Sequence, residues 1–163
     1  MDTKSELKSL IWDVIDSQKD LIKLGDDVLK QTGSLKSWIK RNLFGVILPF
    51  KSLADRAESL NTKFINLKSK LDLFKNNKFS KLSIEDSQAF GILCEFADSL
   101  ALSALILKTN QAKYLSASLG KHSISLHEVL EGIKQYNESI TRYLKVANRL
   151  QPHINRIFKE NHT

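Results

Sequence analysis

The feature that most constrains this chain is the spacing of its apolar residues, which recur at intervals of three and four along four long stretches. The clearest stretch alternates these intervals through Leu53, Ala57, Leu60, Phe64, Leu67, Leu71 and Phe74. An α-helix brings residues at this spacing onto one face, whereas a strand requires strict alternation. The pattern also covers residues 3–32, 83–119 and 126–157. It therefore predicts an all-α fold of four long helices.

Short polar motifs mark where these helices should begin. Each has a Ser or Thr followed three residues later by an acidic residue, whose side chains can satisfy backbone N–H groups at a helix start. The motifs are Thr3-x-x-Glu6, Ser83-x-x-Asp86 and Ser125-x-x-Glu128. Gly33 and Gly120 are expected helix ends. Residues 75–83 are predicted to form a loop, and Pro152 should kink the last helix.

The helices should pack as an antiparallel four-helix bundle in a single domain, residues 1–163. Their matched lengths and short connections favour neighbours that run in opposite directions. Residues 83–119 are apolar on more than one face, which is typical of a central helix. The stripe of residues 3–32 is also wide, because Ile15, Ile22 and Leu29 extend it. No repeat or low-complexity linker indicates a second domain.

The segment IKRNLFGVILPF, residues 39–50, is the most unusual part of the chain, because no residue from Leu43 to Phe50 has a polar side chain. Its apolar positions again follow intervals of three and four, so we expect a shorter extra helix over about 35–48. Pro49 disfavours helical geometry at the preceding residue and should end or kink this helix. Phe44 and Leu48 fall off the main stripe. They could form a contact surface or simply cover the end of the bundle.

Positive charge is concentrated in one part of the sequence. The chain has a net charge of +7. Residues 36–81 carry eleven basic and three acidic residues, a net of +8, whereas residues 1–35 carry five basic and seven acidic residues, a net of −2. We therefore expect a partner with an anionic surface to meet residues 36–81 first.

The sequence favours a cytoplasmic protein, with association to a membrane surface as the alternative. The single Cys94 cannot form an internal disulfide, which fits a reducing compartment. The first residues do not resemble a secretory signal peptide. Residues 89–107 approach the length of a membrane span, but Glu95 and Asp98 interrupt them, and each would cost about 2.5–3.5 kcal/mol at the bilayer centre.

Motifs for catalysis are missing from the sequence. It contains no glycine-rich phosphate loop, no Gly-x-Ser-x-Gly, no His-Glu-x-x-His and no Glu-x-x-His. We therefore expect no enzymatic activity, no cofactor and no bound metal. One alternative remains: Arg156 and His162 have a spacing that resembles the Arg-x4–6-His signature of HEPN-type ribonucleases, which are also small helical bundles. That resemblance implies RNA cleavage by these two side chains.

The leading functional hypothesis is a non-enzymatic protein-interaction module. Its expected contact surface combines aromatic, apolar and cationic side chains at Trp38, Lys40, Arg41, Phe44, Leu48, Phe50 and Lys51. The adjoining helix adds a basic surface of Lys63, Lys68, Lys70, Lys75, Lys78 and Lys81. We do not expect specific nucleic-acid binding, because this region has few arginines and no exposed aromatic residues for base stacking. A homodimer remains open, since helices with two apolar faces can pair with a second copy.

The alternative hypothesis is a bundle that binds or perturbs membranes through the same residues. Lys40 and Arg41 would contact anionic head groups while Trp38, Phe44 and Leu48 enter the interface. A helical bundle with basic residues and a proline-interrupted second helix is similar to the four-helix cell-death bundles of the HeLo and mixed-lineage-kinase-like types. That resemblance implies membrane perturbation, although the first helix here is acidic.

Overall fold

A computed structural model describes residues 2–31, 50–121 and 123–159. They form four long helices, α1 (Thr3–Gln31), α3 (Phe50–Lys78), α4 (Ile84–Ser118) and α5 (Leu126–Lys159), and one 3-10 turn, η1 (Phe79–Lys81). No strand occurs within these ranges. The all-α prediction is confirmed. The shorter helix predicted over about 35–48 lies outside the described residues.

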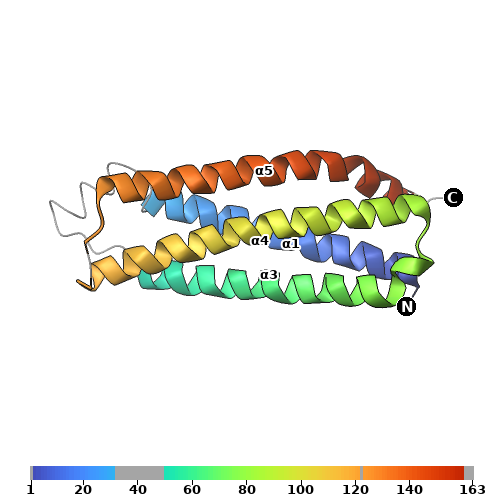
Figure 1. Ribbon diagram of the computed structural model, residues 1–163, viewed down its shortest axis with the longest axis horizontal. Coiled ribbons are helices and arrows are strands. Elements are labelled where there is room, and N and C mark those ends of the chain that lie inside the picture. The colour runs from blue at the N-terminus through green and yellow to red at the C-terminus, as the bar shows by residue number, and fades with distance from the viewer. Residues whose placement is uncertain (1, 32–49, 122, 160–163) are drawn as a thin grey trace.

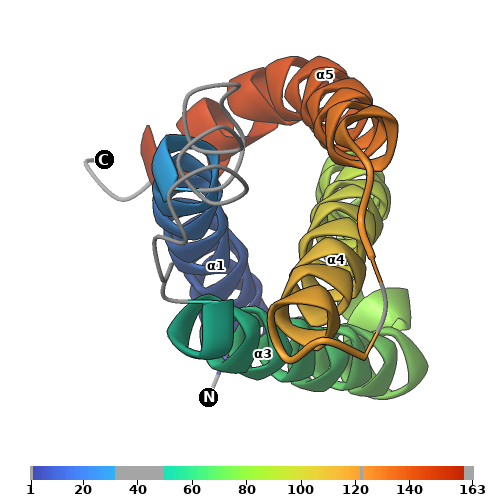
Figure 2. The ribbon, with the colours of Figure 1, turned by 90° about the vertical axis from the view of Figure 1, so that its left-hand side faces the viewer.

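The four helices run side by side with alternating direction (Figure 1). Viewed along the bundle, they occupy four corners in the order α1, α3, α4 and α5 (Figure 2). The helices α3 and α5 pack closely against α4, whereas α1 and α5 have the least contact of the pairs that lie next to each other. The bundle therefore has one side that is packed less tightly than the others.

The core consists of the residues that the apolar spacing placed on the inner faces. Phe64, Leu100 and Leu150 are almost completely buried, and Ile140 is half-buried against the same cluster. Aromatic contacts join the helices, such as Phe96 of α4 with Tyr143 of α5, whose ring centroids are 6.4 Å apart. Burial of each large apolar side chain stabilises the fold by about 1.5–3 kcal/mol. This cluster holds the four helices in one bundle.

The three predicted helix starts are confirmed, and at two of them the capping hydrogen bonds are present. At α4, the backbone N–H of Asp86 donates to Ser83 Oγ at 3.1 Å. At α5, Glu128 N–H donates to Ser125 Oγ at 3.2 Å, and Ser125 N–H donates back to the Glu128 carboxylate at 2.8 Å. This reciprocal pair is a capping box. Gly120 has a φ of 71°, the left-handed geometry expected just after a helix end.

The first capping motif and one loop differ from the prediction. The helix α1 begins at Thr3, so Thr3 is its first residue and not the residue before it, and the Glu6 carboxylate pairs with Lys78 of α3. The segment predicted as a loop over 75–83 is mostly helical, because α3 continues to Lys78 and η1 follows. Phe79 packs on Phe90 at 5.9 Å between ring centroids, which holds this turn against α4.

Two further features concern α4 and α5. The helix α5 continues through Pro152 to Lys159, and its last turns bend away from the straight run (Figure 1). Among the described helices, α4 alone is long and apolar enough to cross a membrane, and half of its most apolar window is buried inside the bundle. The core helix of a bundle can have the same length and composition, and burial accounts for half of this window, while Leu102 and Leu105 of α4 are exposed.

Candidate interaction surface

The flank of α1 that faces α3 is lined by acidic residues seven positions apart, and α3 presents basic residues at matching positions. Because the helices run in opposite directions, the first acidic residue meets the last basic one. The pairs are Glu6–Lys78, Asp13–Lys70 at 2.8 Å, Asp20–Lys63 at 2.7 Å and Asp27–Arg56 at 2.8 Å. We call these four ion pairs the acid–base ladder. It balances much of the charge on α3 within the chain itself.

The ladder shifts the titration of its members in the direction expected for ion pairs. The Arg56 guanidinium donates to Asp27 and lowers the pKa of that carboxyl group. The Asp20 carboxylate accepts a hydrogen bond from Lys63 and raises the pKa of the lysine ammonium group. The Asp16 carboxylate, 3.3 Å from the same Lys63 nitrogen, raises it further. Both shifts favour the charged forms.

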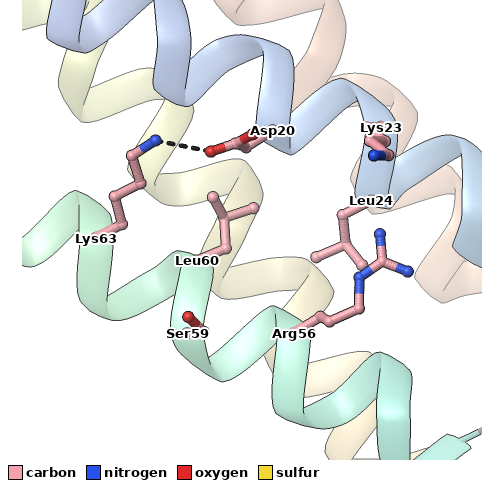
Figure 3. Close-up of a pocket in the computed structure, with 7 residues that line it drawn as sticks. All are labelled: Asp20, Lys23, Leu24, Arg56, Ser59, Leu60 and Lys63. Atoms are coloured by element: carbon pink, nitrogen blue, oxygen red, sulfur yellow. Dashed lines mark hydrogen bonds and ion pairs between the residues drawn. The ribbon is translucent and has the colours of Figure 1, made fainter.

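A surface cleft of about 290 Å³ lies beside the middle of the ladder and is lined by Asp20, Lys23, Leu24, Arg56, Ser59, Leu60 and Lys63 (Figure 3). Its basic side chains do not point together at a space that an anion could occupy. Figure 3 shows Lys63 directed at Asp20, and Arg56 is bound to Asp27. We therefore assign no anion site to this cleft.

The predicted basic surface is largely engaged in ion pairs. Lys63, Lys70 and Lys78 belong to the ladder, and Lys68 pairs with Asp98 of α4 at 2.8 Å. Lys75 and Lys81 have no carboxylate partner among the described residues. The charge available to an external partner on α3 is thus smaller than the sequence suggested.

The predicted contact segment is described only at its end. Trp38, Lys40, Arg41, Phe44 and Leu48 lie outside the described residues. Phe50, which was expected at the contact surface, is buried, and its ring packs against Tyr114 with centroids 6.2 Å apart. Phe50 therefore contributes to the core at this end of the bundle. Lys51 is exposed at the start of α3.

The opposite flank of α1 is apolar and faces α5. Ile15 shares a recess with Ile154 and Phe158 of α5, and Leu29 shares a small cavity with Ile133. Residues seven apart lie on one helical face, so Ile22 lies on this flank between Ile15 and Leu29. On α5, the same relation places Ile140 between Ile133 and Ile154, and Leu144 in line with Phe158. We call this surface the α1/α5 seam; it comprises Trp12, Ile15, Ile22, Leu29, Ile133, Ile140, Leu144, Ile154 and Phe158.

The seam is only partly covered by its own two helices. Trp12 is 55 % exposed, Ile22 is 42 % exposed and Leu144 is 46 % exposed. In the part of the chain that the structure describes, no ion pair joins α1 to α5. The seam therefore differs from the ladder in both chemistry and closure.

At the end of the bundle where α1 begins, the seam contains a recess of about 360 Å³ lined by Trp12, Ile15, Ile154, Asn155, Phe158 and Lys159. The Trp12 and Phe158 rings meet edge to face with centroids 5.6 Å apart. The Lys8 ammonium lies 5.5 Å from the centroid of the Phe158 ring, within reach of a cation–π interaction. The recess thus combines aromatic walls with a cationic edge.

At its other end, the seam is closed by a tyrosine. Gly25 of α1 lies directly against the Tyr136 hydroxyl of α5, and a Cβ atom there would clash with it. Burial raises the pKa of Tyr136. Beside it, Gln111 of α4 is completely buried, and neither of its amide atoms has a hydrogen-bond partner among the residues that the structure describes. The adjoining cavity, of about 10 Å³, has room for about one water molecule.

The residues of the ribonuclease hypothesis are only half described. The Arg156 guanidinium pairs with Asp86 at 2.6 Å and with Glu85 at 3.2 Å, both on α4. His162 lies outside the described residues. No group of side chains able to hold a metal ion occurs in the described ranges. In this arrangement Arg156 connects α5 to α4.

Comparison with protein families, with curated proteins and with solved structures finds no match to this chain. Neither the ladder nor the seam was predicted from the sequence. The ladder had a visible signal, since Glu6, Asp13, Asp20 and Asp27 repeat every seven residues. Ile15, Ile22 and Leu29 had been recognised as apolar, but the sequence did not indicate how far another helix covers them. Trp12 lies off the main stripe of α1 and gave no signal.

Proposed function

We propose that this chain is a non-enzymatic helical-bundle module that binds a partner protein along the α1/α5 seam. The observation that carries the proposal is the partly covered apolar flank of α1, where Trp12 and Ile22 face solvent beside half-buried residues of α5. Grooves between helices are a common site for an added helix. The seam is a different surface from the predicted one of residues 38–50, which lies outside the described residues except at Phe50.

Energetics support this choice. Complete burial of a large apolar side chain contributes about 1.5–3 kcal/mol, and Trp is among the residues that most often dominate interfaces. Exposed ion pairs such as those of the ladder contribute about 0–1 kcal/mol each. A partner that covers Trp12, Ile22 and Leu144 therefore gains more than one that competes for the paired charges of α3.

Affinity capture from extracts of the source cells tests the proposal. Wild type is compared with an Ile22→Asp, Leu144→Asp double variant, and a captured protein is then purified and titrated directly. Ile65→Asp with Leu73→Asp is the matched control, because both residues are exposed on α3, at 58 % and 64 %. We expect the seam variant to lose the partner and the control to keep it. If folded seam variants retain every partner, the proposal is wrong.

The sequence-based alternatives are tested with the same protein. The Phe44→Asp, Leu48→Asp variant asks whether residues 38–50 are the contact surface instead. Flotation with neutral and anionic liposomes at low and physiological salt tests membrane association through Trp38, Lys40 and Arg41. Retention by anionic liposomes that Lys40→Gln with Arg41→Gln abolishes would favour the membrane hypothesis over the seam.

A further inference from the structure

Basic side chains border the seam at its more exposed end. From Ser139 to Lys159, α5 contains five basic residues and no acidic one. Arg149 and Arg156 are bound to Glu95 and Asp86 of α4. The other three, Arg142, Lys145 and Lys159, have no carboxylate partner among the described residues. Arg142 lies seven residues before Arg149 and so shares the α4 side of the helix, whereas Lys159 lines the recess and brings a positive charge to the seam.

The facing half of α1 adds to this charge. Lys8 and Lys19 likewise have no carboxylate partner in the described ranges. The acidic residues in this half of α1 are Glu6, Asp13, Asp16 and Asp20, and all four bind lysines of α3. Other carboxylates near the seam, on Asp26, Glu131 and Glu138, lie toward its other end. The exposed recess is thus bordered by cations on both helices.

We infer that the occupant of the α1/α5 seam is an acidic amphipathic helix, which inserts a large apolar side chain into the recess that Trp12 and Phe158 line. The inference rests on the proposed function. Carboxylates on both flanks of such a helix would face the cations of α1 and α5. The recess of about 360 Å³ is large enough for a Leu or Phe side chain of that helix.

Shape and charge favour this occupant over two others. A second copy of the chain would bring Lys8 and Lys159 against the same basic border, and like charges in contact oppose association. A bilayer surface attracts cations, but it presents no ridge of side chains to fill a recess between two helices. A helix presents such a ridge at intervals of three and four residues.

Synthetic helical peptides test the inference. Three peptides of about 18 residues share one apolar face and differ only in their flanking residues, which are Glu, Gln or Lys. They are titrated into the whole chain carrying Trp38→Phe, so that Trp12 is the single fluorescent tryptophan. We expect the Glu peptide to shift Trp12 emission and to bind about tenfold more tightly than the Gln peptide at low salt. The Lys peptide should bind most weakly.

Matched lysine variants locate the charge effect. Lys8→Gln with Lys159→Gln should weaken binding of the Glu peptide about tenfold, while Lys75→Gln with Lys81→Gln removes the same charge from α3 and η1 and should not change it. Equal affinity of the Glu and Gln peptides overturns the acidic occupant and leaves the proposed function standing. Absence of binding by all three peptides overturns the helical occupant, and the captured partner then judges the proposed function separately.

The other two occupants have their own readouts. If vesicles containing phosphatidylserine shift Trp12 emission while the peptides do not, a membrane surface occupies the seam and the inference is wrong. It is also wrong if sedimentation shows a dimer that Leu144→Asp abolishes. We expect a monomer in sedimentation and no response of Trp12 to vesicles at physiological salt.

Discussion

The two flanks of α1 differ in how far the rest of the chain pairs or covers their side chains. On the flank toward α3, every carboxylate of the ladder has a basic partner within the chain. On the flank toward α5, apolar residues lie together without being fully covered, and Trp12 is 55 % exposed. The most highly charged segment of a sequence is therefore not always the surface most available to a partner.

The two interfaces also perform different physical tasks. Exposed ion pairs contribute about 0–1 kcal/mol each, so the ladder adds modest stability. Its repeat of seven residues disfavours small shifts of α1 along α3, because a shift by less than seven residues would move each acidic side chain away from its basic partner. The seam has apolar contacts without such a pattern of paired charges, and we propose that a partner binds there.

The largest loss of stability is expected from a substitution at Gly25, where α1 lies against Tyr136 of α5. Gly25→Ala places a Cβ against the hydroxyl and ring of buried Tyr136, so we expect unfolding free energy to fall by about 1–3 kcal/mol. Urea denaturation measures this change. Gly91→Ala is the control, since a Cβ there meets nothing within 4 Å and should stabilise the helix by about 0.5–1 kcal/mol. Equal effects at both glycines would contradict the close contact between α1 and α5.

A second prediction concerns the buried amide beside Tyr136. Gln111→Leu removes two polar atoms that have no partner and replaces them with a side chain of similar size, so we expect stability to rise by about 1–2 kcal/mol. Thermal denaturation at neutral pH measures the change. A fall in stability would mean that Gln111 is satisfied in solution, for instance by a bound water, and would remove the polar defect from this end of the seam.

The stability of the fold at acid pH should depend on the charged flank of α1 and not on its apolar flank. Arg56 lowers the folded-state pKa of Asp27, so the stabilisation is present above the unfolded value of 3.8 and is lost as the pH falls through the lower folded value. Asp27→Asn should therefore flatten the acid limb of the stability profile. Ile22→Asn, on the apolar flank, should leave that limb unchanged. An unaltered limb in Asp27→Asn would show that the ladder does not contribute in solution.

The smallest loss of stability is expected from removing one lysine of the ladder. Lys63→Gln removes the ammonium group that binds both Asp20 and Asp16, yet both pairs are exposed, so we expect a loss of about 0.2–1 kcal/mol. The loss should shrink in 1 M salt, because screening weakens exposed pairs. Lys75→Gln serves as the control for removal of an unpaired lysine from the same helix. A loss above about 3 kcal/mol would assign the ladder a structural role that exposed pairs do not have.

The sequence was sufficient to predict the four helices, because apolar spacing and capping motifs are local properties. Ser125 and Glu128 cap α5 as their spacing predicted, and Phe64 and Leu100 are buried. The same local signals failed at residues 75–83, where packing of Phe79 on Phe90 keeps the chain helical. Only tertiary contact decides such a boundary.

The interaction surface could not be predicted in the same way. The basic excess of residues 36–81 was correctly read, but its compensation by α1 depends on which helix lies opposite and in which register. Ile15, Ile22 and Leu29 had the spacing of core residues, and nothing local distinguishes a covered face from an open one. Trp12 is part of the seam only because it contacts Phe158, which is far away in sequence, and the sequence alone does not indicate this contact.

We propose that a partner contacts α1 on its apolar flank and leaves α3 free. Amide hydrogen exchange of the whole chain, alone and saturated with the Glu-flanked peptide, distinguishes these two surfaces. We expect slower exchange in α1 around Lys8–Ile22 and in α5 around Ile140–Phe158, with α3 unchanged. Slower exchange confined to α3, or absent from α1 and α5, would contradict this proposal.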